Sequence, residues 1–191
     1  GILIGLCVIL LATSFYLHFK KKEKYQFKLL LKLSGRLPSD FVEMTNLATG
    51  TFNMSIMGLI LLGYVLINGP IVGSIIGAMS FGAFGNQVKN TVPVLVGIMI
   101  GCYLTGVDVA STSALVAAIF GTTLAPVSGY YGPLAGVIAG FVHITLVSHV
   151  VVMRGGLNLY NNGFAGGFVA AVLVPIFEIF EGIRQDINER K

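Results

Sequence analysis

Charged side chains are scarce in this chain of 191 residues: Asp, Glu, Lys and Arg make up 10%, tryptophan is absent, and only two cysteines occur. Soluble domains carry about 25% charged residues, so most of this chain faces something other than water. Cys7 and Cys102 lie in apolar stretches and lack metal-ligand spacing. These absences exclude a soluble enzyme, a nucleic-acid binder and a secreted disulfide scaffold, and they predict no metal site.

Apolar residues take the place of the missing charges: 55% of the chain is hydrophobic and the mean hydropathy is +0.87. A membrane-crossing helix needs about 20 mainly apolar residues. The sequence therefore predicts an all-α, polytopic membrane bundle of about seven spans, of which 109–124 is short and could instead re-enter. The predicted spans are 1–19, 47–67, 69–85, 91–107, 109–124, 131–152 and 164–182.

The basic residues predict how the bundle is oriented. Seven of the twelve lie between Lys20 and Arg36, directly after the first apolar run. Positive charge is held on the cytoplasmic side, so seven crossings place Lys89 and the tail 183–191 inside and Asp108 and Arg154 outside. This predicts a multi-pass membrane protein whose carboxy terminus is cytoplasmic, in the cytoplasmic membrane if the chain is bacterial, as the resemblance described below implies; attraction of the lysines to anionic lipid is a second interpretation.

Residues 20–46 have basic residues and leucines at helical spacing, which is typical of a segment lying along the membrane interface. Asp40, in the string RLPSD, is a candidate helix cap.

An internal repeat relates residues 48–77 to residues 111–140, with nine identities among the thirty aligned positions. Each copy has a GP pair followed by glycines at every fourth residue, a spacing that lets membrane helices approach closely. The units 47–107 and 109–182 each hold three predicted spans, so the second would be inverted, as in many transporters. The alternative to an inverted repeat is that two unrelated helix hairpins both pack through glycines at the same spacing. The glycines expected at helix contacts are Gly69, Gly73, Gly77, Gly132, Gly136 and Gly140.

Two Gly- and Pro-rich stretches are candidates for a polar path: TTLAPVSGYYGP from Thr122 and RGGLNLYNNGFAGG from Arg154. Broken helices expose backbone groups that hydrocarbon does not tolerate, although an ordinary turn or bonding of Thr and Ser back to their own helix explains them too. His143 lies well inside an apolar run, where ionisable residues are functional candidates. The candidate solute-path residues are Asn158, Asn161, Asn162, Thr122, Thr123, Ser128 and His143.

No nucleophile elbow, zinc-protease helix, phosphate loop or paired carboxylates occur, so neither an enzyme nor a cofactor is expected. The strings AFGNQVKNTVP, LAPVSGYYGPLAGVIAGFVH and GGLNLYNNGFAGG resemble the bacterial membrane family called domain of unknown function 1576, over roughly residues 46–182. The resemblance implies a carboxy-terminal portion of a longer protein and no known activity. The Asn-containing segments are similar, more distantly, to those of urea transporters.

The sequence thus favours a transporter or channel that passes a small, neutral polar solute between two three-helix units. A non-transporting scaffold or subunit of a larger membrane complex is the alternative. The expected partners are the lipid bilayer, the solute, and either a second copy of the chain or amino-terminal helices of the same protein.

Overall fold

The computed structural model describes residues 2–35, 40–65, 75, 78–83, 85–153 and 158–189, and every regular element in these ranges is helical. The all-α fold is therefore confirmed. The longer helices are α1 (Ile2–Phe19), α4 (Leu47–Val65), α6 (Val88–Thr105), α7 (Thr112–Gly121), α8 (Ala125–Tyr131), α9 (Pro133–Met153) and α10 (Asn158–Glu189). The short ones are α2 (Phe27–Leu30), α3 (Phe41–Met44) and the 3-10 turns η1 (Phe81–Ala83) and η2 (Thr122–Leu124).

Five helices among the described residues are long and apolar enough to cross a membrane. They are Ile2–Phe19, Val88–Thr105, Thr112–Tyr131, Pro133–Val150 and Asn161–Glu189, and Leu47–Gly63 is a shorter apolar helix. The chain is a membrane protein. Most of the predicted span 69–85 lies outside the described residues, and so does much of the first copy of the internal repeat, which stays a prediction.

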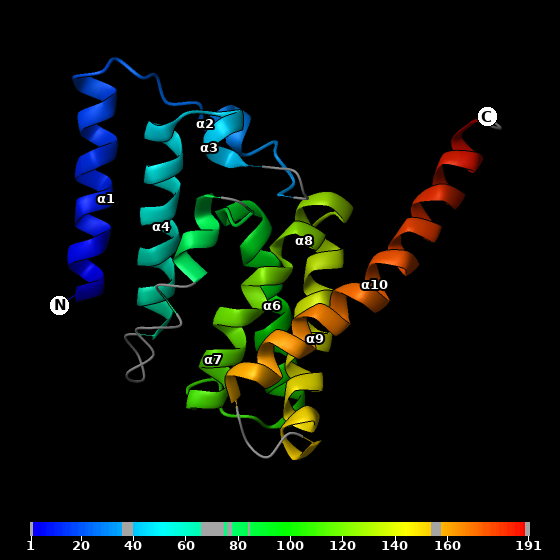
Figure 1. Cartoon of the computed structure of the whole chain (residues 1–191). Coiled ribbons are helices and arrows are strands. Elements are labelled where there is room, and N and C mark those ends of the chain that lie inside the picture. Colours follow the sequence, from blue (N-terminus) through cyan, green and yellow to red (C-terminus); the bar gives the residue numbers. More distant parts are fainter. Residues whose placement is uncertain are drawn as a thin grey trace.

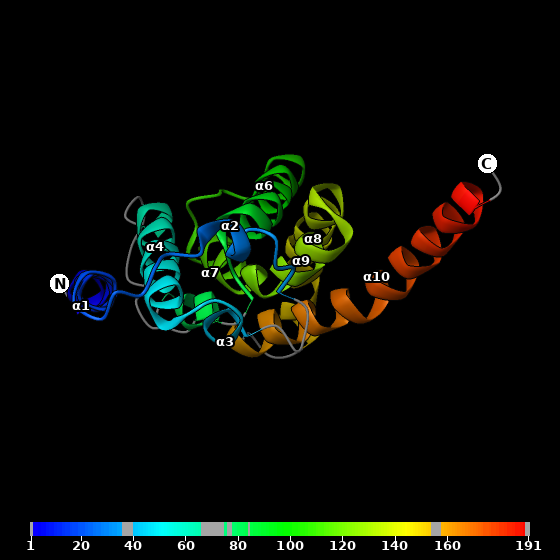
Figure 2. The same ribbon diagram turned by 90° about the horizontal axis from the view of Figure 1, so that it is seen from above.

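The helices form a central bundle with one pair beside it (Figure 1). Helices α1 and α4 run antiparallel to each other on one side, and α6, α7, α8 and α9 make the bundle, in which α6 packs most extensively against α9. Helix α10 starts against α7 and α9 and then runs away from the bundle, which Figure 2 shows from above. Much of α10 therefore faces outward.

Residues 20–46 are less helical than their leucine spacing indicates. Only the single turns α2 and α3 form, and the rest of the described segment is irregular backbone. Side chains of the bundle bind that backbone: Gln87 Nε2 donates to the carbonyls of Leu30 and Leu33 at 3.2 and 3.0 Å. These bonds satisfy carbonyls that a helix would otherwise satisfy internally. Asp40 caps α3 as expected, accepting from the N–H groups of Val42 and Glu43.

The two Gly- and Pro-rich stretches, which were expected to interrupt helices, are mostly helical where the structure describes them. This corrects the predicted ends of the neighbouring spans. The span 109–124 continues to Tyr131, and its interruption is the single 3-10 turn η2. Pro126 explains that turn, since proline lacks an N–H and clashes with the carbonyl four residues earlier. Gly132, with φ of 96°, is where the chain turns into α9. The NNGFAGG segment lies within continuous α10, so it frees few backbone groups.

Helices α6 and α9 pack closely where each contributes a glycine, Gly97 on α6 and Gly140 on α9. A Cβ atom on Gly140 would lie 2.9 Å from the Val94 carbonyl carbon, and one on Gly97 would lie 2.8 Å from that of Val137. A Cβ on Gly136 would overlap Ser128, whereas one on Gly132 would meet nothing within 4 Å. The other glycines expected at helix contacts, Gly69, Gly73 and Gly77, lie outside the described residues.

Candidate functional site

His143 lies at the centre of the membrane-spanning part of the bundle. It is the eleventh of the 21 residues of α9, so at 1.5 Å per residue it is about 15 Å from either end of the helix. Its side chain is fully buried, and the Ala117 backbone and the Asn162 side chain lie against its ring, although neither contact has the distance and angle of a full hydrogen bond. An imidazole always carries at least one N–H donor, so this ring has unused hydrogen-bonding capacity at mid-depth.

Glycines on two neighbouring helices make room for the imidazole. A Cβ on Gly121, at the end of α7, would lie 3.2 Å from His143 Cδ2. A Cβ on Gly166, in α10, would lie 3.9 Å from Cε1 and 4.0 Å from Nδ1 of the same ring. The ring is therefore held between α7 and α10, at positions where neither helix has a side chain.

Two buried asparagines lie near the start of α10, and one of them contacts His143. Asn162 is 2% exposed and its side chain lies within hydrogen-bonding reach of the His143 ring. Asn161 precedes it, is fully buried, and has no partner for either its amide nitrogen or its amide oxygen. Since α10 begins at Asn158, both residues lie near backbone N–H groups that have no partner within the helix. We call His143, Asn161 and Asn162 the midspan polar cluster.

The structure separates the other predicted solute-path residues. Thr123 lies beside the cluster, because a Cβ on Gly166 would be 3.3 Å from its Oγ1. However, Thr122 and Thr123 donate to the carbonyls of Ile119 and Phe120 at 2.6 and 2.7 Å, so both bond back to their own helix. Ser128 lies elsewhere, beside a pocket near residues 31–33. The Asn158 side chain lies outside the described part of the structure.

The sequence analysis missed a second set of buried amides. Asn53 Nδ2 donates to the carbonyls of Gly82 and Asn86 at 2.6 and 2.8 Å, which joins α4 to the chain around η1. Asn90 Nδ2 likewise donates to the Gly85 carbonyl at 2.7 Å. The sequence did contain a signal for these amides: the string NQVKN has three amide side chains within five residues of a mainly apolar chain.

The cluster offers hydrogen bonds but no strong charge. Helices α7, α8 and α9 contain no Asp, Glu, Lys or Arg. Nowhere among the described residues do three His, Cys, Asp or Glu side chains come together as metal ligands. The arrangement can bind water or a polar molecule through donors and acceptors.

These features define a class: a polytopic, all-α membrane protein with a buried polar cluster around the midpoint of α9. The chain belongs to the family described as protein of unknown function (DUF1576), whose sequence model matches residues 19–179, and the predicted family is thereby confirmed. No curated protein and no solved structure matches the chain. The family has no functional assignment, and the likeness to urea transporters stays a prediction.

Proposed function

We propose that the chain forms part of a transporter or channel for a small, neutral, polar solute. The observation that supports this is the midspan polar cluster, in which both amide atoms of the fully buried Asn161 lack a protein partner and His143 is buried beside Asn162. Solute sites of membrane transporters lie near the bilayer midplane, the depth that His143 has along α9.

In a bundle without water or solute, buried polar atoms that make no hydrogen bond lower the stability of the fold. A buried donor or acceptor without a partner lowers stability by about 1–3 kcal/mol. The two amide atoms of Asn161 therefore amount to roughly 2–6 kcal/mol, a large part of the roughly 5–15 kcal/mol that stabilises a folded protein. Leucine in place of Asn161 would avoid this loss. A polar solute that both donates and accepts hydrogen bonds would remove it.

The charge of the solute follows from the groups that surround it. Asn161 supplies an amide donor and acceptor, and a neutral His143 supplies one of each. An isolated ion in the membrane interior needs a compensating charge, and α7, α8 and α9 provide no strongly charged side chain. A neutral molecule therefore fits the cluster better than an anion or a cation, and binding requires no enzymatic step.

A scaffold role is the second candidate, and the outer face of α10 supports it. Large apolar side chains repeat every four residues along this face and are exposed: Phe164, Phe168, Val172, Ile176 and Phe180. Lipid, a second copy of the chain or further helices of the same protein could cover them. A scaffold can have a dry interior, so a bound solute distinguishes the two functions.

The test is thermal melting of the purified full-length protein in detergent with a panel of neutral polar metabolites and of ions. A ligand at 100 times its Kd stabilises the native state by about 2.7 kcal/mol. We expect one class of neutral solutes to raise the melting temperature, and Asn161→Leu to abolish the rise. His149→Ala is the control, because His149 is exposed on the same helix and faces the Thr145 carbonyl at 2.7 Å.

Two results would contradict the proposal. One is that only charged compounds stabilise the protein. The other is that the stabilisation by a neutral solute is unchanged in Asn161→Leu.

A further inference from the structure

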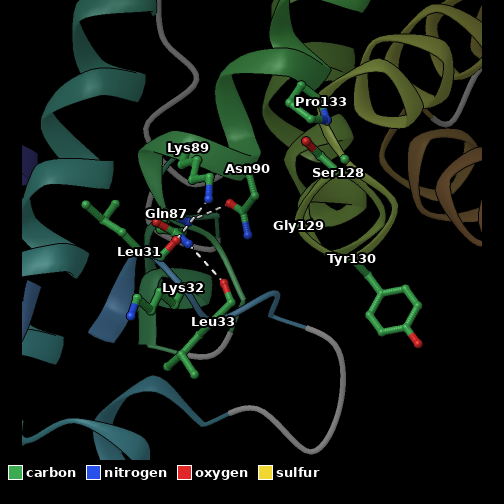
Figure 3. A pocket seen from close by; sticks show the side chains of 11 residues that line it. Leu31, Lys32, Leu33, Gln87, Lys89, Asn90, Ser128, Gly129, Tyr130 and Pro133 are labelled. Carbon is green, nitrogen blue, oxygen red and sulfur yellow. Dashed lines mark hydrogen bonds between the residues drawn. The ribbon is translucent and has the colours of Figure 1, made fainter. Parts of the chain in front are cut away.

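A pocket of about 150 Å³ lies where three segments meet (Figure 3). Residues 31–33 form one side, the first turn of α6 forms another, and the junction of α8 and α9 closes it. Figure 3 shows Gln87 and Lys89 on one wall and Ser128 and Pro133 across from them, while the Tyr130 ring points away. The midspan polar cluster contributes none of the lining residues.

Two lysines, Lys32 and Lys89, line this pocket, and none of its lining residues is acidic. Lys89 Nζ donates to the Leu31 carbonyl at 3.3 Å, which leaves other hydrogens of the ammonium group for a ligand. The Lys32 side chain is turned outward in Figure 3 and reaches the pocket by rotating. Helices α6 and α9, of 18 and 21 residues, both begin at the pocket, and their dipoles favour an anion there.

Two buried polar atoms at the pocket have unused hydrogen-bonding capacity, which is independent evidence for a ligand. The Ser128 side chain is 4% exposed and its Oγ has no hydrogen bond. The Gln87 side chain is 2% exposed and its Nε2 is fully used, whereas its Oε1 faces only the Asn90 N–H in the capping box of α6 and keeps a second lone pair for a ligand. Ser128 can donate to an anion, whereas Gln87 Oε1 can only accept. The pocket therefore calls for a ligand with both an acceptor and a donor.

We propose that this pocket binds a phosphate group that carries a hydroxyl-bearing substituent. Lys32, Lys89 and Ser128 bind the phosphate oxygens, and a hydroxyl of the substituent donates to Gln87 Oε1. A glycerol phosphate has this chemistry, either as the headgroup of an anionic phospholipid or as a free molecule in water. The inference does not depend on transport, because the pocket and the midspan polar cluster share no residue.

The test is binding to the purified full chain in a detergent that carries no phosphate, followed by native mass spectrometry and by circular-dichroism melting. The probes are phosphatidylglycerol, phosphatidylcholine, free glycerol 3-phosphate and inorganic phosphate. The variant is the double change Lys32→Gln with Lys89→Gln. Its control is Lys21→Gln with Lys28→Gln, which removes the same charge from residues that do not line the pocket. Ser128→Ala tests the hydroxyl.

We expect phosphatidylglycerol or glycerol 3-phosphate to bind and raise the melting temperature, and phosphatidylcholine to bind more weakly. The Lys32 and Lys89 double variant should lose at least tenfold in affinity, which corresponds to about 1.4 kcal/mol, since it removes two charged donors. The control should stay within about twofold. Binding of the lipid alone identifies a headgroup site, and binding of the free phosphate compounds identifies a water-soluble ligand. Equal losses in both double variants, or no binding by any probe, would overturn the proposal.

Discussion

Replacing Gly140 by alanine should destabilise the protein, although alanine is the better helix former. The added Cβ would lie 2.9 Å from the Val94 carbonyl carbon and closer still to its oxygen. Real Cβ atoms essentially never lie within 3.0 Å of another heavy atom, and both atoms of the Val94 carbonyl would lie inside that limit, so α6 and α9 must separate by roughly 0.5–1 Å at this crossing. The obstacle is backbone, which no side-chain rotation can move. A gap of 0.5–1 Å forfeits roughly a quarter to a half of the dispersion energy of the atoms that it parts.

The magnitude follows from the cost of overpacking a tight interior, about 1–3 kcal/mol. For a protein of this length, 1 kcal/mol shifts the melting temperature by roughly 2–4 °C. Gly140→Ala should therefore lower the melting temperature by roughly 2–12 °C. Gly167 is the matched control, because it is also inside a helix but a Cβ there would meet nothing within 4 Å. Gly167→Ala should raise stability by about 0.5–1 kcal/mol through lower backbone entropy.

The assay is circular-dichroism melting of both variants and the parent in the same detergent. The helix-propensity gain is common to the two substitutions, so the difference between them isolates the packing at Gly140. Opposite signs of the two shifts are expected. If Gly140→Ala melts at or above the temperature of Gly167→Ala, α6 and α9 do not approach as closely as the structure has them, and the packing argument is wrong.

Two further predictions concern topology and transport. Single cysteines at Lys22 and Asp108, in a background without the two native cysteines, should react differently with a membrane-impermeant thiol reagent on intact cells: position 108 is labelled and position 22 is not, and the reverse pattern would invert the orientation. Solute flux in proteoliposomes should persist without an ion gradient and should fall more in Asn161→Ala than in His143→Ala. Flux that disappears when a proton gradient is collapsed, together with complete loss in His143→Ala, would instead make His143 a coupling group.

Five of the helices that are long enough to cross a membrane, and the position of His143 well inside one of them, could be predicted from the sequence within a few residues at most of their ends, because both depend on the length of apolar runs. The Asp40 cap could also be predicted, since capping is local: the side chain accepts from N–H groups two and three residues along the chain. The class of fold is likewise set by composition, which leaves too few charges for a soluble surface.

The helical path through NNGFAGG could not be predicted, because Gly and Asn favour turns in water. In a bundle, unsatisfied backbone groups are costly, so the helix persists from Asn158 onward. The packing partner of Gly140 could not be predicted either. The internal repeat aligns Gly140 with Gly77 in sequence, but it does not say which residue packs against Gly140, and in the structure that residue is Val94 on α6. Local spacing indicates that a helix face is small, but it does not indicate which helix packs there.

Glycine lets helices approach each other at two levels of this bundle, and together these contacts place a polar cluster at mid-depth. At Gly97 and Gly140 the missing side chain lets α6 and α9 approach until their backbones are in contact, which fixes where the two helices cross. At Gly121 and Gly166 the missing side chain lets α7 and α10 come up to the imidazole of His143, and Ile98 fills the remaining space beside Gly121. The first pair sets the position of α9, and the second brings the buried asparagines of α10 near its central residue. Polar groups at this depth are what a solute site inside a membrane requires.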